Sequence, residues 1–261
     1  MDNSLRTSAS GMIAQQRMID VIANNLANVN TTGFKRSRVS FEDVLYETVQ
    51  GARVAGPNGS ETLPPIQIGK GVRIGQVLRL HAQGTPETTQ RPLDVAIEGE
   101  GFFQLERPDG SVAYTRDGSF SLSDSGTLVT SEGDAVMPGI AVPPEATNLT
   151  ISPNGSVTVS TPGAADTEIG KIELARFLNP NGLLSIGNNQ YSATEASGDP
   201  ITGAPQEEGF GRLMQGALES SNVEIVQEMT DMIAAQRAYE INAKAIRAGE
   251  DMMQMTNDLI R

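Results

Sequence analysis

The chain has 261 residues, 32 acidic and 19 basic, so its formal net charge at pH 7 is −13. This balance argues against general nucleic-acid or anionic-membrane binding, which requires basic surfaces. The sequence has no cysteine and one histidine, His81, so it offers neither thiolates nor paired imidazoles for metal or triad chemistry. We therefore expect no catalytic residues, no metal, no cofactor and no nucleic-acid partner.

The charge is distributed unevenly along the chain. Residues 86–210 carry eighteen acidic and five basic side chains, whereas residues 1–40 carry two and five. This pattern predicts ends that meet other protein and a centre that meets water. No apolar run approaches the roughly 18 residues of a membrane span. Arg6, Arg17 and Asp20 interrupt the first apolar stretch, so we expect no cleaved secretory signal.

The first thirty residues predict an amphipathic helix. Positions spaced alternately by three and four residues form a heptad seam with two polar members: Leu5, Ser8, Met12, Gln15, Ile19, Ile22, Leu26 and Val29. Thr31, Thr32 and Gly33 then predict the end of the helix, with Gly33 in a left-handed conformation. Amides are poor helix formers, and we interpret Asn24, Asn25 and Asn28 as residues that fix helix register.

The last forty residues predict a longer heptad helix. Its strict seven-residue series is Leu218, Ile225, Met232, Tyr239, Ile246, Met253 and Ile260, with companions Met229, Gln236 and Ala243. Ser220, Ser221 and Asn222 form the predicted N-cap region, and Glu224 lies where a carboxylate favours the helix dipole. Neither terminal helix can bury its apolar heptad stripe alone, so each is expected to pack against another protein segment.

The central region predicts short strands joined by tight turns. The turn signals are Asp109-Gly110, Asp117-Gly118, Ser125-Gly126, Asn154-Gly155 and Asn181-Gly182. They separate β-type runs at 93–97, 102–105, 112–114, 157–159 and 172–177. Residues 34–70 connect this body to the first helix. Phe41, Val44, Leu45 and Tyr46 could form a short helix, and residues 51–65 are predicted to be a flexible or extended loop.

We therefore expect an α+β protein, with terminal helices forming a coiled-coil-like layer around a central all-β domain. The predicted divisions are 1–33 for the first helix, 34–70 for the connection, 71–215 for the β-rich outer domain and 216–261 for the second helix.

Several patterns invite a catalytic or binding interpretation, and each has a simpler one. Glu98 and Glu100 resemble a glycosidase pair, but no apolar pocket is evident and a solvated surface is favoured. The glycines at 69–75 and 99–101 lack the spacing of phosphate loops and suit turns. Asp109, Asp117, Asp124 and Asp134 lie in or near glycine turns, which explains them without calcium. His81 is expected to be structural. Lys35, Arg36 and Arg38 form a basic patch expected to be solvated or intersubunit.

Long motifs at both ends resemble those of bacterial flagellar rod and hook proteins. They are Ser10-Gly11-Met12 and the run from Ala23 to Lys35; Gln215-Gly216, Glu219 and Ser221-Asn222-Val223; and Glu228-Met229, Met232-Ile233, the run from Gln236 to Glu240, and Asn242. The middle also fits, at Pro92-Leu93-Asp94, Ile97-Glu98-Gly99, Gly101-Phe102-Phe103 and the run from Tyr114 to Gly118. Within this family, residues 46–75 resemble the extra segment of distal rod subunits, which helps to hold the rod straight. The residues concerned are Tyr46, Leu63, Pro64, Pro65, Ile66, Ile68 and Gly69.

The resemblance implies a subunit of a hollow helical tube that transmits torque from motor to hook. It implies an inner helical layer whose assembly interface includes Leu5, Met12, Ile19, Ile22, Asn24, Asn25, Leu26, Asn28, Val29, Phe34, Leu218, Asn222, Ile225, Met229, Met232, Gln236, Arg237, Tyr239, Asn242, Ile246, Met253 and Ile260. The implied partners are further copies of the chain, proximal rod proteins, hook or hook-junction subunits, the bushing proteins of the peptidoglycan and outer-membrane rings, and the flagellar type III export apparatus. The implied location is the distal rod, from the periplasm to the outer membrane.

Three alternatives stay open at this point. A proximal rod or hook subunit is less consistent with the chain length and with residues 46–75. A β-fold carbohydrate-acting enzyme using Glu98 or Glu100 has no need of heptad ends. An acidic surface adhesin is expected to carry a secretory signal.

Overall fold

The computed structural model describes residues 2–51, 53–55, 61–63, 65–162 and 166–259. It divides the chain into two compact units. The terminal unit comprises residues 1–26, 37–78 and 225–261, and the central unit comprises residues 27–36 and 79–224. Along the sequence, one helix precedes the β-rich region and one follows it, so the predicted α+β class is confirmed.

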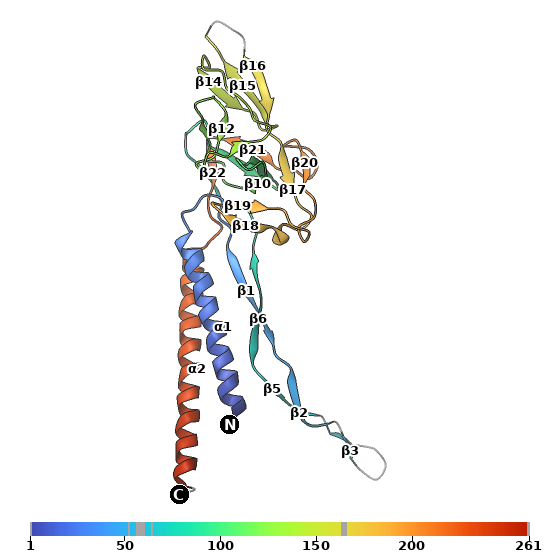
Figure 1. Cartoon of the computed structure of the whole chain (residues 1–261), viewed down its shortest axis with the longest axis vertical. Coiled ribbons are helices and arrows are strands. Elements are labelled where there is room, and N and C mark those ends of the chain that lie inside the picture. The colour runs from blue at the N-terminus through green and yellow to red at the C-terminus, as the bar shows by residue number, and fades with distance from the viewer. Residues whose placement is uncertain (1, 52, 56–60, 64, 163–165, 260–261) are drawn as a thin grey trace. The chain divides into compact units, whose positions relative to one another are not determined.

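The two helices of the terminal unit, α1 (Asp2–Ala27) and α2 (Ile225–Leu259), lie side by side and run in opposite directions (Figure 1). The prediction of one long helix at each end is therefore confirmed. Gly33 adopts a φ of +67°, the left-handed conformation expected after the first helix, although α1 itself already ends at Ala27. In the described part of the chain, neither helix has an apolar stretch long enough to cross a bilayer.

The start of the second helix was predicted too early. Leu218 lies on strand β22 (Ala217–Glu219), opposite Glu87 of β7 (Pro86–Thr88), so it cannot share a helical heptad with Ile225. Asn222 does not form the predicted N-cap, because its side-chain amide binds backbone groups of other segments. Pairing of β22 with β7 keeps the backbone extended up to Glu219, and the backbone becomes helical only at Ile225.

The remainder of the terminal unit is a ribbon of antiparallel strand pairs (Figure 1). The pairs are β1 (Ser37–Asp43) with β6 (Val72–Arg79), β2 (Tyr46–Gln50) with β5 (Ile66–Gly69), and β3 (Arg53–Ala55) with β4 (Glu61–Leu63). The short helix considered for residues 41–46 is wrong, because cross-strand pairing extends Phe41 and Tyr46. Strands β3 and β4 occupy part of residues 51–65, for which a flexible or extended loop was predicted, so the described part of that segment is extended.

The central unit contains the main sheet. Its strands follow the order β11 (Ser121–Leu122), β12 (Leu128–Val129), β13 (Ala135–Val136), β9 (Phe102–Glu106), β10 (Val112–Thr115), β19 (Gln190–Ser192) and β18 (Leu184–Gly187), with β17 (Leu174–Arg176) joining β9 to β20 (Ile201–Gly203). Beside it are the sheet β14 (Asn148–Ile151), β15 (Ser156–Ser160), β16 (Thr167–Lys171), the pairs β21 (Arg212–Gln215) with β8 (Val95–Glu98) and β22 with β7, and the 3-10 turn Pro180–Gly182.

Strands lie within or overlap all the β-type runs predicted from the sequence. Gly110, Gly126 and Gly155 adopt positive φ angles of 78°, 79° and 89°, as the turn signals predicted. Side chains from several sheets form one fully enclosed core, and Val95, Ile97, Phe103 and Leu105 are 0% exposed. The central unit therefore buries its own apolar residues.

Candidate functional site

The buried polar contact between the two helices is made by Asn25. Asn25 is 1% exposed and Glu228 is 0% exposed. The amide Nδ2 of Asn25 donates to Glu228 Oε2 at 3.1 Å and to the carbonyl of Ser37 at 2.8 Å. Its Oδ1 accepts from the Ser37 amide at 2.9 Å. One side chain thus joins α1, α2 and the first residue of β1, and such a contact specifies one register of these elements.

Small residues allow α1 and α2 to approach closely. A Cβ added to Gly11 would lie 2.9 Å from Nδ2 of Asn242, and one added to Gly249 would lie 2.8 Å from Cδ2 of Leu5. Ala14 and Ala235 are 3% and 2% exposed. A larger residue at either glycine would require the side chain of Asn242 or Leu5 to shift, so these glycines leave room for those side chains between the helices.

The predicted seam of α1 lies on the covered side of the helix but not at its centre. The most buried positions of α1 are Ala14, Ile22 and Asn25, and of these only Ile22 belongs to the seam. Ile22 is 4% exposed, and the other members of the seam described by the structure are half-buried. Ile13, which is outside the seam, is 60% exposed. Of the three amides, Asn25 is buried, Asn28 is half-buried and Asn24 points to solvent. Phe34 is buried in the central unit, and Val29 there is half-buried.

The face of α2 that α1 covers differs from the predicted stripe. The most buried positions also recur every seven residues, at Glu228, Ala235, Asn242 and Gly249. The first three lie one residue before the predicted companions Met229, Gln236 and Ala243. Members of the predicted stripe are divided: Met232, Ala243 and Ile246 are half-buried, whereas Ile225, Met229, Gln236, Tyr239 and Met253 are exposed. Arg237, which the resemblance placed at the assembly interface, is exposed as well. Ile260 lies outside the described residues. Sequence periodicity found the apolar positions, but the small and polar ones face α1.

Much of the apolar surface of α2 is therefore uncovered in the single chain. Val226 is 74% exposed, Ile241 is 65% exposed, and Ile233 is 53% exposed. The other large apolar side chains in this exposed set are Ile225, Met229, Tyr239, Met252, Met253 and Met255. An exposed set of this extent on one helix is typical of a protein–protein contact surface.

The β2–β5 ribbon also exposes apolar side chains. Tyr46 pairs with Gly69, and the exposed fractions are 55% for Tyr46, 53% for Ile66 and 47% for Ile68. Pro65 is exposed as well. The side chain of Leu63 and the whole of Pro64 lie outside the described residues. Two-stranded ribbons are marginally stable alone, so these side chains are available for a covering partner.

A buried ionic cluster in the central unit was not predicted. Lys35 donates to Glu219 at 2.5 Å and to the carbonyl of Ala82 at 2.8 Å, and Arg116 donates to the other oxygen of Glu219 at 3.3 Å. These three side chains are 0–6% exposed. Burial lowers the pKa of Lys35, and the charge of Glu219 opposes that shift.

The expected basic patch is therefore wrong for Lys35, which is buried, whereas Arg38 is exposed. The local pattern Lys35-Arg36-Ser37-Arg38 carries no sign of a carboxylate 184 residues away. Lys35 and Glu219 both lie in the motifs that carry the family resemblance, but those motifs do not indicate that the two side chains pair.

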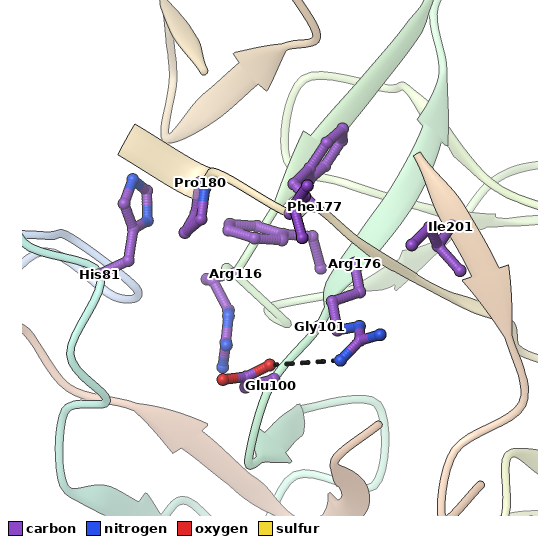
Figure 2. Close-up of a pocket in the computed structure, with 10 residues that line it drawn as sticks. His81, Glu100, Gly101, Arg116, Arg176, Phe177, Pro180 and Ile201 are labelled. Atoms are coloured by element: carbon purple, nitrogen blue, oxygen red, sulfur yellow. Dashed lines mark ion pairs between the residues drawn. The ribbon is translucent and has the colours of Figure 1, made fainter. Parts of the chain in front are cut away.

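A cavity of about 220 Å³ lies in the central unit next to this cluster. Two of its lining residues form an ion pair, in which Arg176 Nη1 lies 3.9 Å from Glu100 Oε2 (Figure 2). His81 lines it and packs edge-on against Phe102 and Tyr191. Burial first, and then the charges of Lys35, Arg79 and Arg116, lower the pKa of His81 to about 4, so the imidazole is neutral at pH 7.

The carboxylates considered for catalysis have other contacts. Glu98 accepts from Arg212 at 2.7 Å, and this bond lowers the pKa of its exposed carboxyl. The side chain of Glu100 is 77% exposed and pairs with Arg176. Both flank Gly99, whose φ of +113° belongs to a turn. Glu100 lines the cavity described above, but its carboxylate is mostly exposed and pairs with Arg176, and that of Glu98 pairs with Arg212. Neither carboxyl group therefore has the desolvated setting that raises the pKa of a glycosidase acid.

The aspartates considered for calcium act in turns or in the sheet. Asp109 accepts from the amide and hydroxyl of Ser111, and Asp117 accepts from the Ser119 amide. Asp134 accepts from the side chain of Gln190 at 2.5 Å. Across the described residues, no group of three or more His, Asp or Glu side chains is arranged to hold a metal ion.

Known proteins similar to this chain extend over its whole length. It is 48% identical to the flagellar basal-body rod protein FlgG of Borreliella burgdorferi over 266 aligned positions, covering 100% of both chains. The protein of the same name from Caulobacter vibrioides is 47% identical, with 98% of each chain covered. That from Bacillus subtilis is 39% identical, with 100% of each covered. The chain belongs to the flagellar basal-body rod protein family.

Three family models match separate parts of this rod-family chain. The flagella basal body rod protein model matches residues 5–35, which include most of α1 and Lys35. The flagellar hook protein FlgE/F/G D1 domain matches residues 96–159 in the central unit. The flagellar basal body rod FlgEFG protein C-terminal model matches residues 214–259, which include Glu219 and α2. The recognition of the rod and hook family from the motifs at both ends is thus confirmed.

Proposed function

We propose that the chain is a structural subunit of the flagellar distal rod, a hollow helical tube that transmits torque from motor to hook. It is a structural protein and not an enzyme. The observation that carries the proposal is the uncovered apolar surface of α2, on which Val226, Ile233 and Ile241 are each more than half exposed. Burial of this surface by neighbouring copies would provide the driving force for polymerisation.

Helical assembly would let other copies of the chain cover the apolar face of α2. The polar and small face of α2 is already used by α1, so the apolar face is free for other copies. A head-to-tail contact that does not close into a ring continues as an open helical filament. We infer that α1 and α2 of successive copies form a coiled-coil-like inner layer, in which the exposed members of the predicted interface, such as Ile225, Met229 and Tyr239, meet neighbouring copies.

The β2–β5 ribbon has a separate role in this proposal. Its exposed side chains Tyr46, Ile66 and Ile68 would be covered by neighbouring copies. Covering them would stiffen a ribbon that is marginal alone, and stiff contacts between copies keep a rod straight. This agrees with the resemblance of residues 46–75 to the extra segment of distal rod subunits.

The proposed partners are those of a rod subunit. They are other copies of the chain, proximal rod proteins on one side, hook or hook-junction subunits on the other, and the peptidoglycan- and outer-membrane-ring bushing proteins around it. Location in the flagellar basal body follows from the family, and we propose the distal rod, reached by type III export. The acidic central unit would face the bushing, where a hydrated surface of one charge sign resists sticking.

Electron microscopy of basal bodies from a strain lacking this gene tests the proposal. Short rods without a hook, restored to full length by the complementing gene, are the expected result. A full-length rod that lacks only the hook would identify a hook subunit instead. Loss of the whole rod would indicate a proximal subunit, and intact flagella would overturn the proposal.

A further inference from the structure

All covalent connections between the two units run through three segments of the central unit. The chain passes between units after residues 26, 36, 78 and 224. The corresponding segments of the central unit are 27–36, the stretch from 79 to 85, and the stretch from 217 to 224. Any force carried along the backbone from one unit to the other must pass through these segments.

Asn222 binds all three of these segments together. Its Oδ1 accepts from the backbone amide of Arg36 at 2.7 Å. Its Nδ2 donates to the carbonyl of Leu80 and to that of Ala82, both at 2.9 Å. Its own backbone amide points to the carbonyl of Phe34 at 3.4 Å. A single side chain thus spans connections that are more than 40 and more than 100 residues apart in sequence.

Glu219 makes a second link between the same three segments, in a buried setting. Its backbone carbonyl accepts from the Gly33 amide at 2.7 Å. Its side-chain Oε1 accepts from Lys35 and from the Gly84 amide at 2.8 Å, and Oε2 accepts from Arg116. Lys35 in turn donates to Ala82. Arg116 lies on the loop after β10, so this link also attaches the connections to the body of the central unit.

The chemistry of these links suits a part that carries load. Apolar contacts are non-directional, so segments held only by them can slide without losing much contact. Hydrogen bonds weaken steeply when their geometry is disturbed, and bonds to buried charged groups are the strongest of them. A shear between the connecting segments would strand buried charges of Lys35, Arg116 and Glu219, which low-dielectric surroundings make unfavourable.

We propose that Asn222, together with the buried Lys35–Glu219–Arg116 cluster, forms a load-bearing joint that holds the connecting segments of the central unit as one body. This inference rests on the proposed function, because only a torque-transmitting subunit has load to carry. Without the joint each connection would yield separately, so a subunit could still fold and assemble but would twist more under torque.

The chain contains a matched control for Asn222 in Gln215. Gln215 Nε2 donates to the carbonyls of Pro92 and Leu149, both at 2.8 Å, and its Oε1 accepts from the Ile151 amide at 3.1 Å. Both amides are half-buried, and each makes two donor bonds and one acceptor bond to backbone groups. The difference is that Gln215 joins strands within the β body, whereas Asn222 joins connections.

Hydrogen exchange on the purified full chain tests the joint directly. Asn222→Ala is expected to speed exchange severalfold at Arg36, Leu80 and Gly84 together, while Gln215→Ala speeds exchange at Ile151 and leaves those three amides unchanged. Asn222→Asp retains the oxygen that accepts from the Arg36 amide and loses the NH2 group that donates to the carbonyls of Leu80 and Ala82. It should therefore speed hydrogen exchange at Leu80 more than at Arg36. It replaces the alanine variant in this test if the alanine variant does not fold. Local change at Arg36 alone in the alanine variant would overturn the proposal.

Rotation under load tests the role. In strains carrying each variant, rods of normal length by electron microscopy are expected, with a severalfold loss of rotation at high viscosity for Asn222→Ala and little loss for Gln215→Ala. Equal behaviour of the two variants at high load would overturn the load-bearing role while leaving the rod assignment intact. Intact rods and normal motility in the deletion strain would instead overturn the proposed function itself, and the role of the joint with it.

Discussion

The central and terminal units satisfy their apolar residues in opposite ways. In the central unit Phe103 and Leu105 are 0% exposed and belong to one core shared by several sheets. In the terminal unit α2 exposes Val226 and Ile241 by 74% and 65%. The β-rich unit is complete within one chain, whereas the helical unit is complete only after assembly. The β-rich unit thus needs no partner to bury its core, whereas the helices of the terminal unit present apolar surface that another chain can cover.

The largest change in the free energy of unfolding is expected from the core of the central unit. Phe103→Ala removes a ring that packs edge-on against Phe120 at 5.0 Å and should cost about 3–5 kcal/mol. Denaturant unfolding of the free chain measures this. Leu178→Ala is the control, because Leu178 is 90% exposed and should change stability by less than about 0.5 kcal/mol. Equal losses in the two variants would contradict a self-contained core.

The next largest effect concerns pH and His81. Its pKa is about 4 in the folded chain and 6.5 when exposed, so between these values the unfolded chain binds a proton that the folded chain does not. Stability is therefore unaffected above pH 6.5, falls as the pH drops, and is lower by up to about 3 kcal/mol at pH 4. His81→Phe removes this component and leaves the carboxylates in place. Parallel stability curves for the two proteins between pH 7 and 5 would refute the assignment.

A smaller loss is expected from the contact between the helices. Asn25→Ala leaves the buried Glu228 carboxylate and the backbone of Ser37 without this partner, at a cost of about 1–3 kcal/mol. Faster hydrogen exchange along α1 is the readout. Gln16→Ala at an exposed position of the same helix should be close to neutral, because glutamine and alanine are both good helix formers. If Gln16→Ala loosens α1 as much as Asn25→Ala, the buried amide does not set the register.

The smallest effect on the free chain should accompany a large effect on assembly. Ile233 is 53% exposed, so Ile233→Asp should change the monomer's stability by less than about 0.5 kcal/mol. It places a charge on the proposed contact surface of α2, and rods should not form in cells that carry it. Ile233→Leu keeps the surface apolar and should form rods visible by electron microscopy. Normal rods with the aspartate variant would exclude this face from the assembly interface.

Features coded within a few residues were predictable from the sequence. Heptad spacing found both helices, and glycine turns such as Asn154-Gly155 located the hairpins, because backbone conformation there depends on neighbouring residues. The seam of α1 from Leu5 to Leu26 was located on the covered side of the helix, although Ala14 and Asn25 outside it are more buried than its members. Motifs at both ends were long enough to identify the family.

Tertiary structure decided what depends on partners far away in the chain. Which face of α2 meets α1 is set by the close approach of Gly11 to Asn242 and by Asn25 with Glu228, so small and polar residues occupy the interface while the apolar stripe points outward. Lys35 is buried because Glu219 lies 184 residues further on. Helical periodicity reports how apolar an element's faces are; the partner that covers each face is a property of the folded chain and, for this protein, of the assembly.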